Sequence, residues 1–192
     1  MPLALALSTA CTTVDKTLER ARIPCGLYRW RIKTLSDPDA NAIRWKPIDT
    51  TIKNLVTMTS PPMFDRRRRN ANEFYVYRVR AVLSHIHGNL DQDLHLTLRD
   101  PDDPKASLVA EVPNPSCTRV NDHDPAFATV RVTARTLRER RAGTLVEVTG
   151  VGFFDRLHRA RGGAKNRFEL HPVISLRAIE PGAERQASHG RP

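Results

Sequence analysis

Three carboxylates in the middle of the sequence could act together as ligands for a metal ion. Asp93, Asp100 and Glu111 lie on or beside two segments with strand-like patterns, so they could meet on one face of a sheet. Such carboxylates hold Ca²⁺ or Mg²⁺, and Arg99 could stabilise the charge that develops on a phosphate during hydrolysis. These residues therefore predict a metal-dependent nuclease as one hypothesis. The structural alternative is that Asp100 caps the turn at Pro101 and that Glu111 pairs with an arginine.

Basic side chains concentrate in one later segment, residues 155–172. The expected ligand-binding residues are His95 and the basic residues and histidines of that segment, namely Arg156, His158, Arg159, Arg161, Lys165, Arg167 and His171. Residues 131–167 contain ten Arg or Lys against three acids, in a chain with a net charge of +10 at pH 7. Because a guanidinium binds two phosphate oxygens at once, this charge favours nucleic acid or another polyanion as partner. The alternative is that the excess of arginine, 25 Arg against 6 Lys, is compositional and most of these side chains are solvated.

Two pairs of acidic and histidine residues bracket this segment. Asp155 precedes His158 by three positions, and Glu169 precedes His171 by two. The pairs could form a site for a metal or for acid–base chemistry. The structural interpretation, which we favour, is a clamp on the loop, in which His171 bonds to backbone before Pro172 and Asp155 caps the turn.

One further pair of histidines has a spacing that suits metal binding. His85 and His87 are two residues apart, so on a strand they share one face. No third ligand lies nearby in the sequence, which makes this the weaker metal hypothesis. The chain contains no nucleophile elbow, Walker loop, dinucleotide-binding fingerprint or HExxH motif.

The cysteines and the first residues of the chain are relevant to whether the protein is exported. No two of the three cysteines have CxxC spacing, which excludes a zinc ribbon. Residues 1–11 are apolar and small like a short signal peptide, but they lack a basic beginning. The chain is therefore expected to be exported if the true start lies upstream, and cytoplasmic otherwise. In an exported chain Cys25 and Cys117 could pair, leaving Cys11 over. The chain contains no run of 18 apolar residues, so no membrane-spanning helix is expected.

The pattern of the chain divides it into four parts. Residues 1–22 are expected to be disordered or a degenerate export segment, and 23–72 an extension that packs on a barrel. Within this extension we expect residues 26–34 to be extended, 50–58 to be a helical turn or a strand, and Arg66–Arg69 to be a solvated loop or, less favoured, a nucleic-acid arm. Residues 73–180 form the expected barrel, and 181–192 a disordered tail.

Alternation and helical spacing predict the elements of the barrel. Strands are expected at 74–83, 94–98, 107–112, 144–154 and 173–179, with a helix over 125–140. The helix has Asp124 as N-cap and Pro125 at its first position. Leu94, Leu96 and Leu98 alternate with polar residues, which predicts one wet face on the second strand.

The order of these elements predicts the fold. Three strands, a helix and two strands make a mainly β protein with one or two helices, and a five-stranded OB-type barrel has this order, with its helix between strands 3 and 4. The alternative is a generic α+β sandwich. OB barrels bind oligonucleotides on the face of strands 2 and 3, beneath the loops after strands 1 and 4. The basic segment 155–172 is the second of those loops, so an OB-like domain that binds nucleic acid is the leading hypothesis. An exported structural or interaction domain without catalysis remains a further alternative.

Several motifs resemble a family of largely uncharacterised bacterial proteins, many of them exported. The matching residues are Cys25-Gly26 with Trp30 and Lys33-Thr34, Asp93-Leu-His95, Glu111-Val-Pro-Asn-Pro-Ser-Cys117, Gly150-Val-Gly-Phe-Phe-Asp155 with His158, and Glu169-Leu-His-Pro172. The resemblance covers residues 23–180 and implies a fold similar to the staphylococcal-nuclease-like OB barrel. It implies no particular activity. The chain departs from the family pattern at residues 159–161, 165 and 167, and these changes make the loop more basic.

Overall fold

The computed structural model describes residues 28–61, 67–68, 70–88, 92–117, 124–140, 142–156 and 162–180. The strands are β1 Arg44–Thr50, β2 Tyr75–Gly88, β3 Leu94–Arg99, β4 Ser107–Val112, β5 Thr144–Phe154 and β6 Phe168–Ala178. The helices are α2 Trp30–Lys33, α3 Ile52–Val56 and α4 Asp124–Arg138, with short 3₁₀ turns at Ala40–Ala42, Ala71–Phe74 and Pro115–Cys117. Within the described residues only α4 is long, so the protein is mainly β, as predicted.

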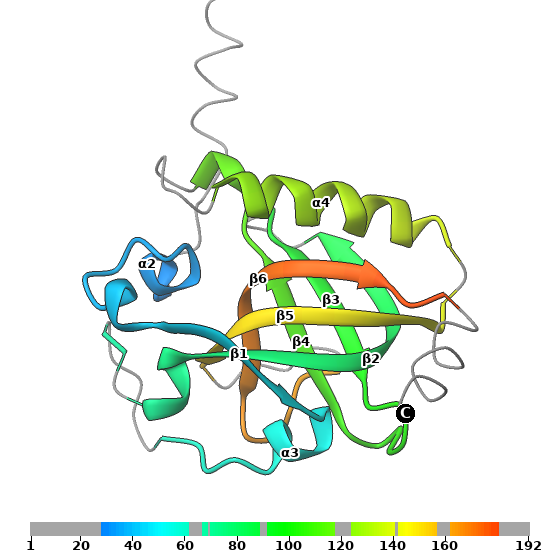
Figure 1. Cartoon of the computed structure of the whole chain (residues 1–192), viewed down its shortest axis with the longest axis horizontal. Coiled ribbons are helices and arrows are strands. Elements are labelled where there is room, and N and C mark those ends of the chain that lie inside the picture. Colours follow the sequence, from blue (N-terminus) through cyan, green and yellow to red (C-terminus); the bar gives the residue numbers. More distant parts are fainter. Residues whose placement is uncertain are drawn as a thin grey trace, which may run out of the picture.

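Five strands close into a barrel in the order β2-β3-β4-β6-β5, and a β2–β5 pairing completes the circle. The β4–β6 pairing is parallel, and the other pairings of the barrel are antiparallel. Helix α4 connects β4 to β5 and crosses the top of the barrel in Figure 1. This order, with a helix between the third and fourth barrel strands, is that of the OB fold, which confirms the predicted fold class.

Alternating side chains of the strands fill the barrel. Leu94, Leu96 and Leu98 of β3 are buried in the same cluster as Leu108 and Ala110 of β4. From α4 the cluster receives Val130, Ala134 and Leu137, whose helical spacing places them on one face. Gly143, with φ of +99°, turns the chain after α4, and its N–H donates to the Leu83 carbonyl (2.9 Å).

The residues before the barrel are fixed to it by two buried arginines. Arg29 donates to both oxygens of Glu73 (2.6 and 2.9 Å) and to the Phe154 carbonyl (2.8 Å). Arg68 donates to Asp37 (3.0 and 3.1 Å) and to the Glu73 carbonyl (2.7 Å). The prediction that Arg66–Arg69 form a solvated loop is therefore wrong at Arg68, because its guanidinium has buried backbone and carboxylate acceptors.

Two features of the same region differ from what the sequence indicated, and a third agrees with it. The extended segment expected at residues 26–34 contains the helical turn α2 instead. Residues 50–58 contain the short helix α3, one of the two alternatives expected there, and its Thr51 side chain accepts from the Asn54 N–H (3.1 Å). The pattern gave no strand at β1, because this edge strand contains Pro47 and exposes most of its side chains. It pairs in parallel with β2.

The last strand begins earlier than predicted. β6 starts at Phe168 and not at Val173, so the connection after β5 is shorter than the expected 155–172 loop. The polar residues Glu169 and His171 gave this stretch the pattern of a loop. They are strand residues on the outer face of the barrel, and both are buried.

Candidate functional site

A polar centre lies on the outer face of the barrel, over β3, β4 and β6. We use this name for Asp93, His95, Glu111, Glu169 and His171. None of these five is more than 7% exposed. Since the neighbouring leucines point into the barrel, these side chains point outward, yet they are covered. The prediction that β3 has a solvent-exposed face is therefore wrong, because His95 and Thr97 are both buried.

One segment lies over this centre, and a second lies over Thr97 on the same face of β3. Lys33, at the end of α2, places its Nζ 3.6 Å from Glu111 Oε2. The connection between β5 and β6 crosses Thr97 so closely that a Cβ on Gly162 would lie 2.2 Å from Thr97 Cγ2. Phe153 of β5 closes another side, with its ring centroid 5.5 Å from that of His171 and 5.4 Å from Lys33 Nζ. The surface that binds ligands in OB barrels is occupied here by the chain itself.

Strand register brings the residues of the polar centre together. His95 and Glu111 are direct cross-strand partners of β3 and β4. In the parallel β4–β6 pair, Val109 faces Glu169 and Ala110 faces Leu170, so the next step along both strands brings Glu111 beside His171. Asp93 comes immediately before β3, and its Oδ1 accepts from the Asn114 N–H (2.6 Å).

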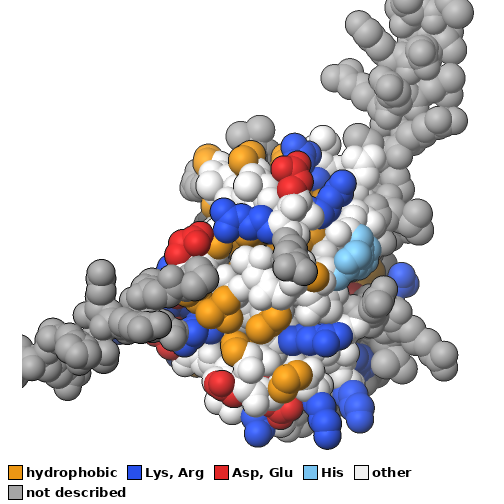
Figure 2. Space-filling view, turned by 90° about the vertical axis from the view of Figure 1, so that its right-hand side faces the viewer, with side chains coloured by type: hydrophobic (Ala, Val, Ile, Leu, Met, Phe, Trp, Pro, Cys, Tyr) orange, Lys and Arg blue, Asp and Glu red, His pale blue; other side chains and the backbone are white. Residues whose placement is uncertain are grey.

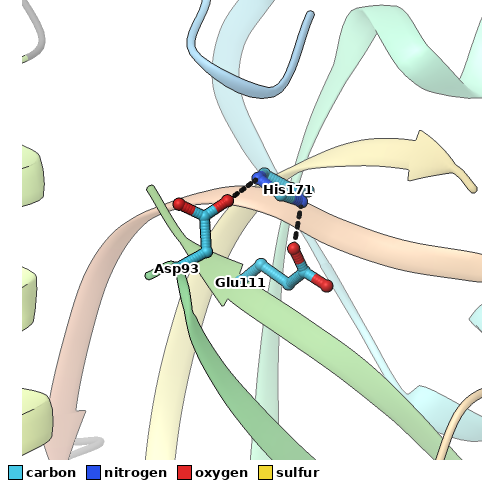
Figure 3. A group of neighbouring side chains, drawn as sticks. All are labelled: Asp93, Glu111 and His171. Carbon is cyan, nitrogen blue, oxygen red and sulfur yellow. Dashed lines mark ion pairs between the residues drawn. The ribbon is translucent and has the colours of Figure 1, made fainter. Parts of the chain in front are cut away.

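The ring of His171 lies between two carboxylates (Figure 3). His171 Nδ1 is 3.0 Å from Glu111 Oε2, and His171 Nε2 is 3.8 Å from Asp93 Oδ2. Neither nitrogen of this fully buried ring is aligned for a hydrogen bond. The other Glu111 oxygen, Oε1, is 2.8 Å from His95 Nε2. Glu111 therefore joins two imidazoles and Lys33.

The buried charges shift the pKa values of the carboxyl groups in opposite directions. Burial opposes ionisation of Glu111, but attraction to His171, with His95 and Lys33 contributing, holds the pKa of Glu111 well below its usual value. Burial, followed by repulsion from Glu111 and Asp155, raises the pKa of Glu169 well above its usual value. The pKa of Lys33 is raised by Glu111 and the other carboxylates against the effect of burial. The centre is thus rich in carboxylates and favours positive charge.

The geometry fits a metal ion at three of these residues. Asp93, Glu111 and His171 each offer one ligand atom, and these atoms lie within 4.8 Å of one another. Two carboxylates and an imidazole suit Zn²⁺, Mn²⁺ or Fe²⁺, whereas Ca²⁺ takes six to eight oxygen ligands. The imidazole thus argues against the Ca²⁺ or Mg²⁺ expected from carboxylates alone.

The structure brings together two of the three predicted metal ligands. Asp93 and Glu111 meet, but Asp100 lies elsewhere and accepts from the backbone N–H groups of Lys53 (2.9 Å) and Asp102 (3.0 Å). Asp100 therefore has the structural role given as its alternative. Arg99 ends β3 with an exposed side chain.

The basic residues of the predicted ligand loop differ in their contacts and exposure. The Arg156 guanidinium lies 5.7 Å from the centroid of the Tyr28 ring. Lys165 is exposed, and Arg167 donates to Ser60 Oγ and the Pro61 carbonyl. His158, Arg159 and Arg161 lie outside the described residues.

The clamp interpretation is wrong for the side chain of His171, which faces Glu111 and Asp93. A backbone bond closes the loop instead, from the Asp155 N–H to the Arg167 carbonyl (3.0 Å). Sequence reasoning did not assign Lys33 to the site. Its place in the Trp30–Thr34 motif was the signal that could have found it.

Cys117 is disulfide-bonded. Cys11 and Cys25 lie outside the described residues, so the expected pairing with Cys25 stays a prediction. Among the helices of the described ranges, none is long and apolar enough to cross a membrane.

Comparisons with known proteins give only distant likenesses. No protein-family model and no curated protein matches the chain. A structure described as an aspartyl-tRNA synthetase from Leishmania major Friedlin has a TM-score of 0.42 and 15% identity, over 70% of this chain and 21% of that chain. The structure of OBody AM3L09 bound to hen egg-white lysozyme has a TM-score of 0.40 and 13% identity, over 57% of this chain and 85% of that chain. Because both scores are below 0.5, the fold assignment rests on strand order.

Proposed function

We propose that this protein is an OB-type barrel that binds one divalent transition-metal ion in its polar centre. The observation that supports the proposal is the buried triad of Asp93, Glu111 and His171, whose ligand atoms lie within 4.8 Å of one another. An imidazole that is fully buried without an aligned hydrogen bond is costly, and a metal ion would satisfy it. The carboxylates would supply the negative charge.

The cover over the centre indicates what such a metal would do. Asp93, Glu111 and His171 are all buried and Lys33 lies against Glu111, so a polymeric substrate has no direct access to the triad. A bound ion would hold β3, β4 and β6 together beneath the N-terminal segment. We therefore favour metal binding over metal-dependent nuclease activity, which would require the cover to open.

The test is a titration of chelator-treated protein with Zn²⁺, Mn²⁺, Ca²⁺ and Mg²⁺, followed by calorimetry and by metal content after desalting. We expect one Zn²⁺ or Mn²⁺ per chain and a higher melting temperature, with Asp93→Asn and His171→Asn losing both. Asp102→Asn, an exposed carboxylate of the same type, is the control and should bind normally. Absence of binding by the unmodified protein, or equal binding by all variants, would contradict the proposal.

A second candidate function is the binding of single-stranded nucleic acid. It is favoured by one surface feature: Trp45, 39% exposed, lies between the exposed Arg44 and Lys46 on the edge strand β1. Bases stack on exposed aromatic rings, and neighbouring cations neutralise phosphates. The exposed Lys165 of the β5–β6 connection adds to the positive charge.

This candidate is tested with labelled single- and double-stranded DNA and RNA at low and high salt. Replacing Arg44, Trp45 and Lys46 together by Ala should weaken retention and reduce its salt dependence. The matched control replaces Val132, Arg135 and Arg138 on α4, which likewise removes two cations and one exposed apolar side chain. Equal losses from both sets would indicate diffuse charge, and cleavage in the presence of added metal would instead support the nuclease hypothesis.

A further inference from the structure

Three histidines form a row that leads from the surface of the barrel to the polar centre. His85 and His87 of β2 have stacked rings with centroids 5.3 Å apart. His87 is the cross-strand partner of His95 in β3, and their ring centroids are 5.1 Å apart. His85 is exposed, His87 is half-buried and His95 is buried, so the row crosses from solvent to interior.

The inner end of this row contacts a proposed metal ligand. His95 Nε2 is 2.8 Å from Glu111 Oε1, and Glu111 belongs to the triad. A metal ion that reached His95 would therefore already be beside the centre. A buried metal site needs such a route, because the ion must enter from solvent.

The outer end of the row has the chemistry to capture a metal ion. Two imidazoles two residues apart on one side of a strand are suitable nitrogen ligands for Zn²⁺, Ni²⁺ or Cu²⁺. No third His, Cys, Asp or Glu of the described residues completes this pair at the close spacing found for the triad. Water would fill the remaining positions, which favours rapid exchange over storage.

The surroundings of His85 also favour weak, reversible capture. It lines a surface pocket of about 310 Å³ with Ser84, Leu137, Arg138 and Arg140. The two arginines repel a cation, and Arg140 is only partly balanced by Glu180, 3.4 Å away on an exposed surface. Figure 2 shows histidine surface on a face of the molecule that also carries several Lys and Arg side chains. We therefore expect this surface site to have a lower affinity for a metal ion than the carboxylate-rich centre has.

We propose that His85 and His87 form a surface site that takes up a transition-metal ion and passes it, by way of His95, to the polar centre. This proposal rests on the proposed metal function of the triad. The transfer is ligand exchange alone: water on the ion is replaced by imidazoles and then by Asp93, Glu111 and His171. The electrophilic ion moves toward increasing negative charge.

The experiment measures how fast the full chain takes up Zn²⁺ from a coloured indicator in stopped flow, and how much it finally holds. His85→Asn with His87→Asn removes both surface ligands, and His85→Asn alone changes only an exposed position. Ser175→Ala, an exposed position on β6 that does not line this pocket, is the control. We expect the double variant to take up Zn²⁺ about tenfold more slowly, with the final stoichiometry unchanged, and the single variant to show a smaller delay.

The outcomes separate the two proposals. An unchanged uptake rate in the double variant would overturn the surface site. An equal delay in Ser175→Ala would also overturn it, because the effect would then not depend on the imidazoles. If His171→Asn holds as much Zn²⁺ as the unmodified protein while the double variant holds less, the triad proposal fails and the histidine pair is a separate metal site.

Discussion

Glu111 Oε2 lies 3.0 Å from His171 Nδ1, although 60 residues separate the two in the sequence. The contact crosses the parallel β4–β6 pair, and the second Glu111 oxygen contacts His95 across the antiparallel β3–β4 pair. One carboxylate therefore joins three strands of the barrel. Its surroundings lead to four predictions.

Glu111→Gln should destabilise the metal-free protein by about 3–5 kcal/mol, because it leaves the largely buried ammonium of Lys33 without its counter-charge. Urea unfolding in the presence of EDTA measures the effect. The control is Glu147→Gln, whose partner Arg177 has a side chain that is 61% exposed. That surface pair should contribute less than about 1 kcal/mol. Similar losses in the two variants would show that the buried network contributes no more than a surface ion pair.

Gly162→Ala should disturb the packing of the β5–β6 connection on β3 for two reasons. Gly162 has a φ of +81°, and a Cβ there would collide with Thr97 Cγ2. Gly143→Ala provides the matched control, since its φ is +99° but nothing lies within 4 Å of the added Cβ. We expect a loss of about 1–2 kcal/mol from the backbone strain in both, and an additional loss only at Gly162. Thr97→Ser, which removes Cγ2, should recover the additional loss; failure to do so would contradict this packing.

Lys33→Met should tighten metal binding and weaken the metal-free fold. Lys33 Nζ lies 3.6 Å from Glu111 Oε2, where it repels an incoming cation and also neutralises the carboxylate. Calorimetric titration with Zn²⁺ measures the first effect and thermal unfolding in EDTA the second. Lys53→Met, at an exposed pair with Asp103, is the control and should change neither. Weaker Zn²⁺ binding by Lys33→Met would place Lys33 among the groups that assist the ion.

Glu169→Gln should stabilise the metal-free protein at neutral pH. The folded state raises the pKa of Glu169, so it keeps a proton that the unfolded chain loses as the pH rises above the usual value for glutamate. Over that range the unmodified protein should lose up to about 1.4 kcal/mol of stability per pH unit relative to the variant. Below the usual glutamate pKa the two proteins should differ little. Chemical unfolding in EDTA from pH 4 to 8 measures this difference, and a constant difference at every pH would contradict it.

Local patterns determined most of the barrel. The alternation of Leu94, Leu96 and Leu98 predicted β3, and the apolar run at 107–112 predicted β4 with its observed bounds. Asp124-Pro125 and the spacing of Val130, Ala134 and Leu137 predicted α4. These signals are readable because they repeat every two or every 3.6 residues within one element. The order of elements was then sufficient to indicate the OB fold, and Asp93 and Glu111 were recognised as neighbours because their strands are consecutive.

Only the tertiary structure decided which polar residues share the centre and which side of the barrel is covered. His171 joins Asp93 through the pairing of β4 with β6, and Lys33 reaches Glu111 from a separate segment. Alternation distinguishes the two faces of a strand, but it does not say whether another segment covers the outer one. The sequence pattern therefore indicated exposed or loop positions for His95, Thr97 and Glu169. In the structure, that face is enclosed by Gly162, Phe153 and Lys33. Burial of this kind depends on contacts between residues far apart in the chain, which no local spacing records.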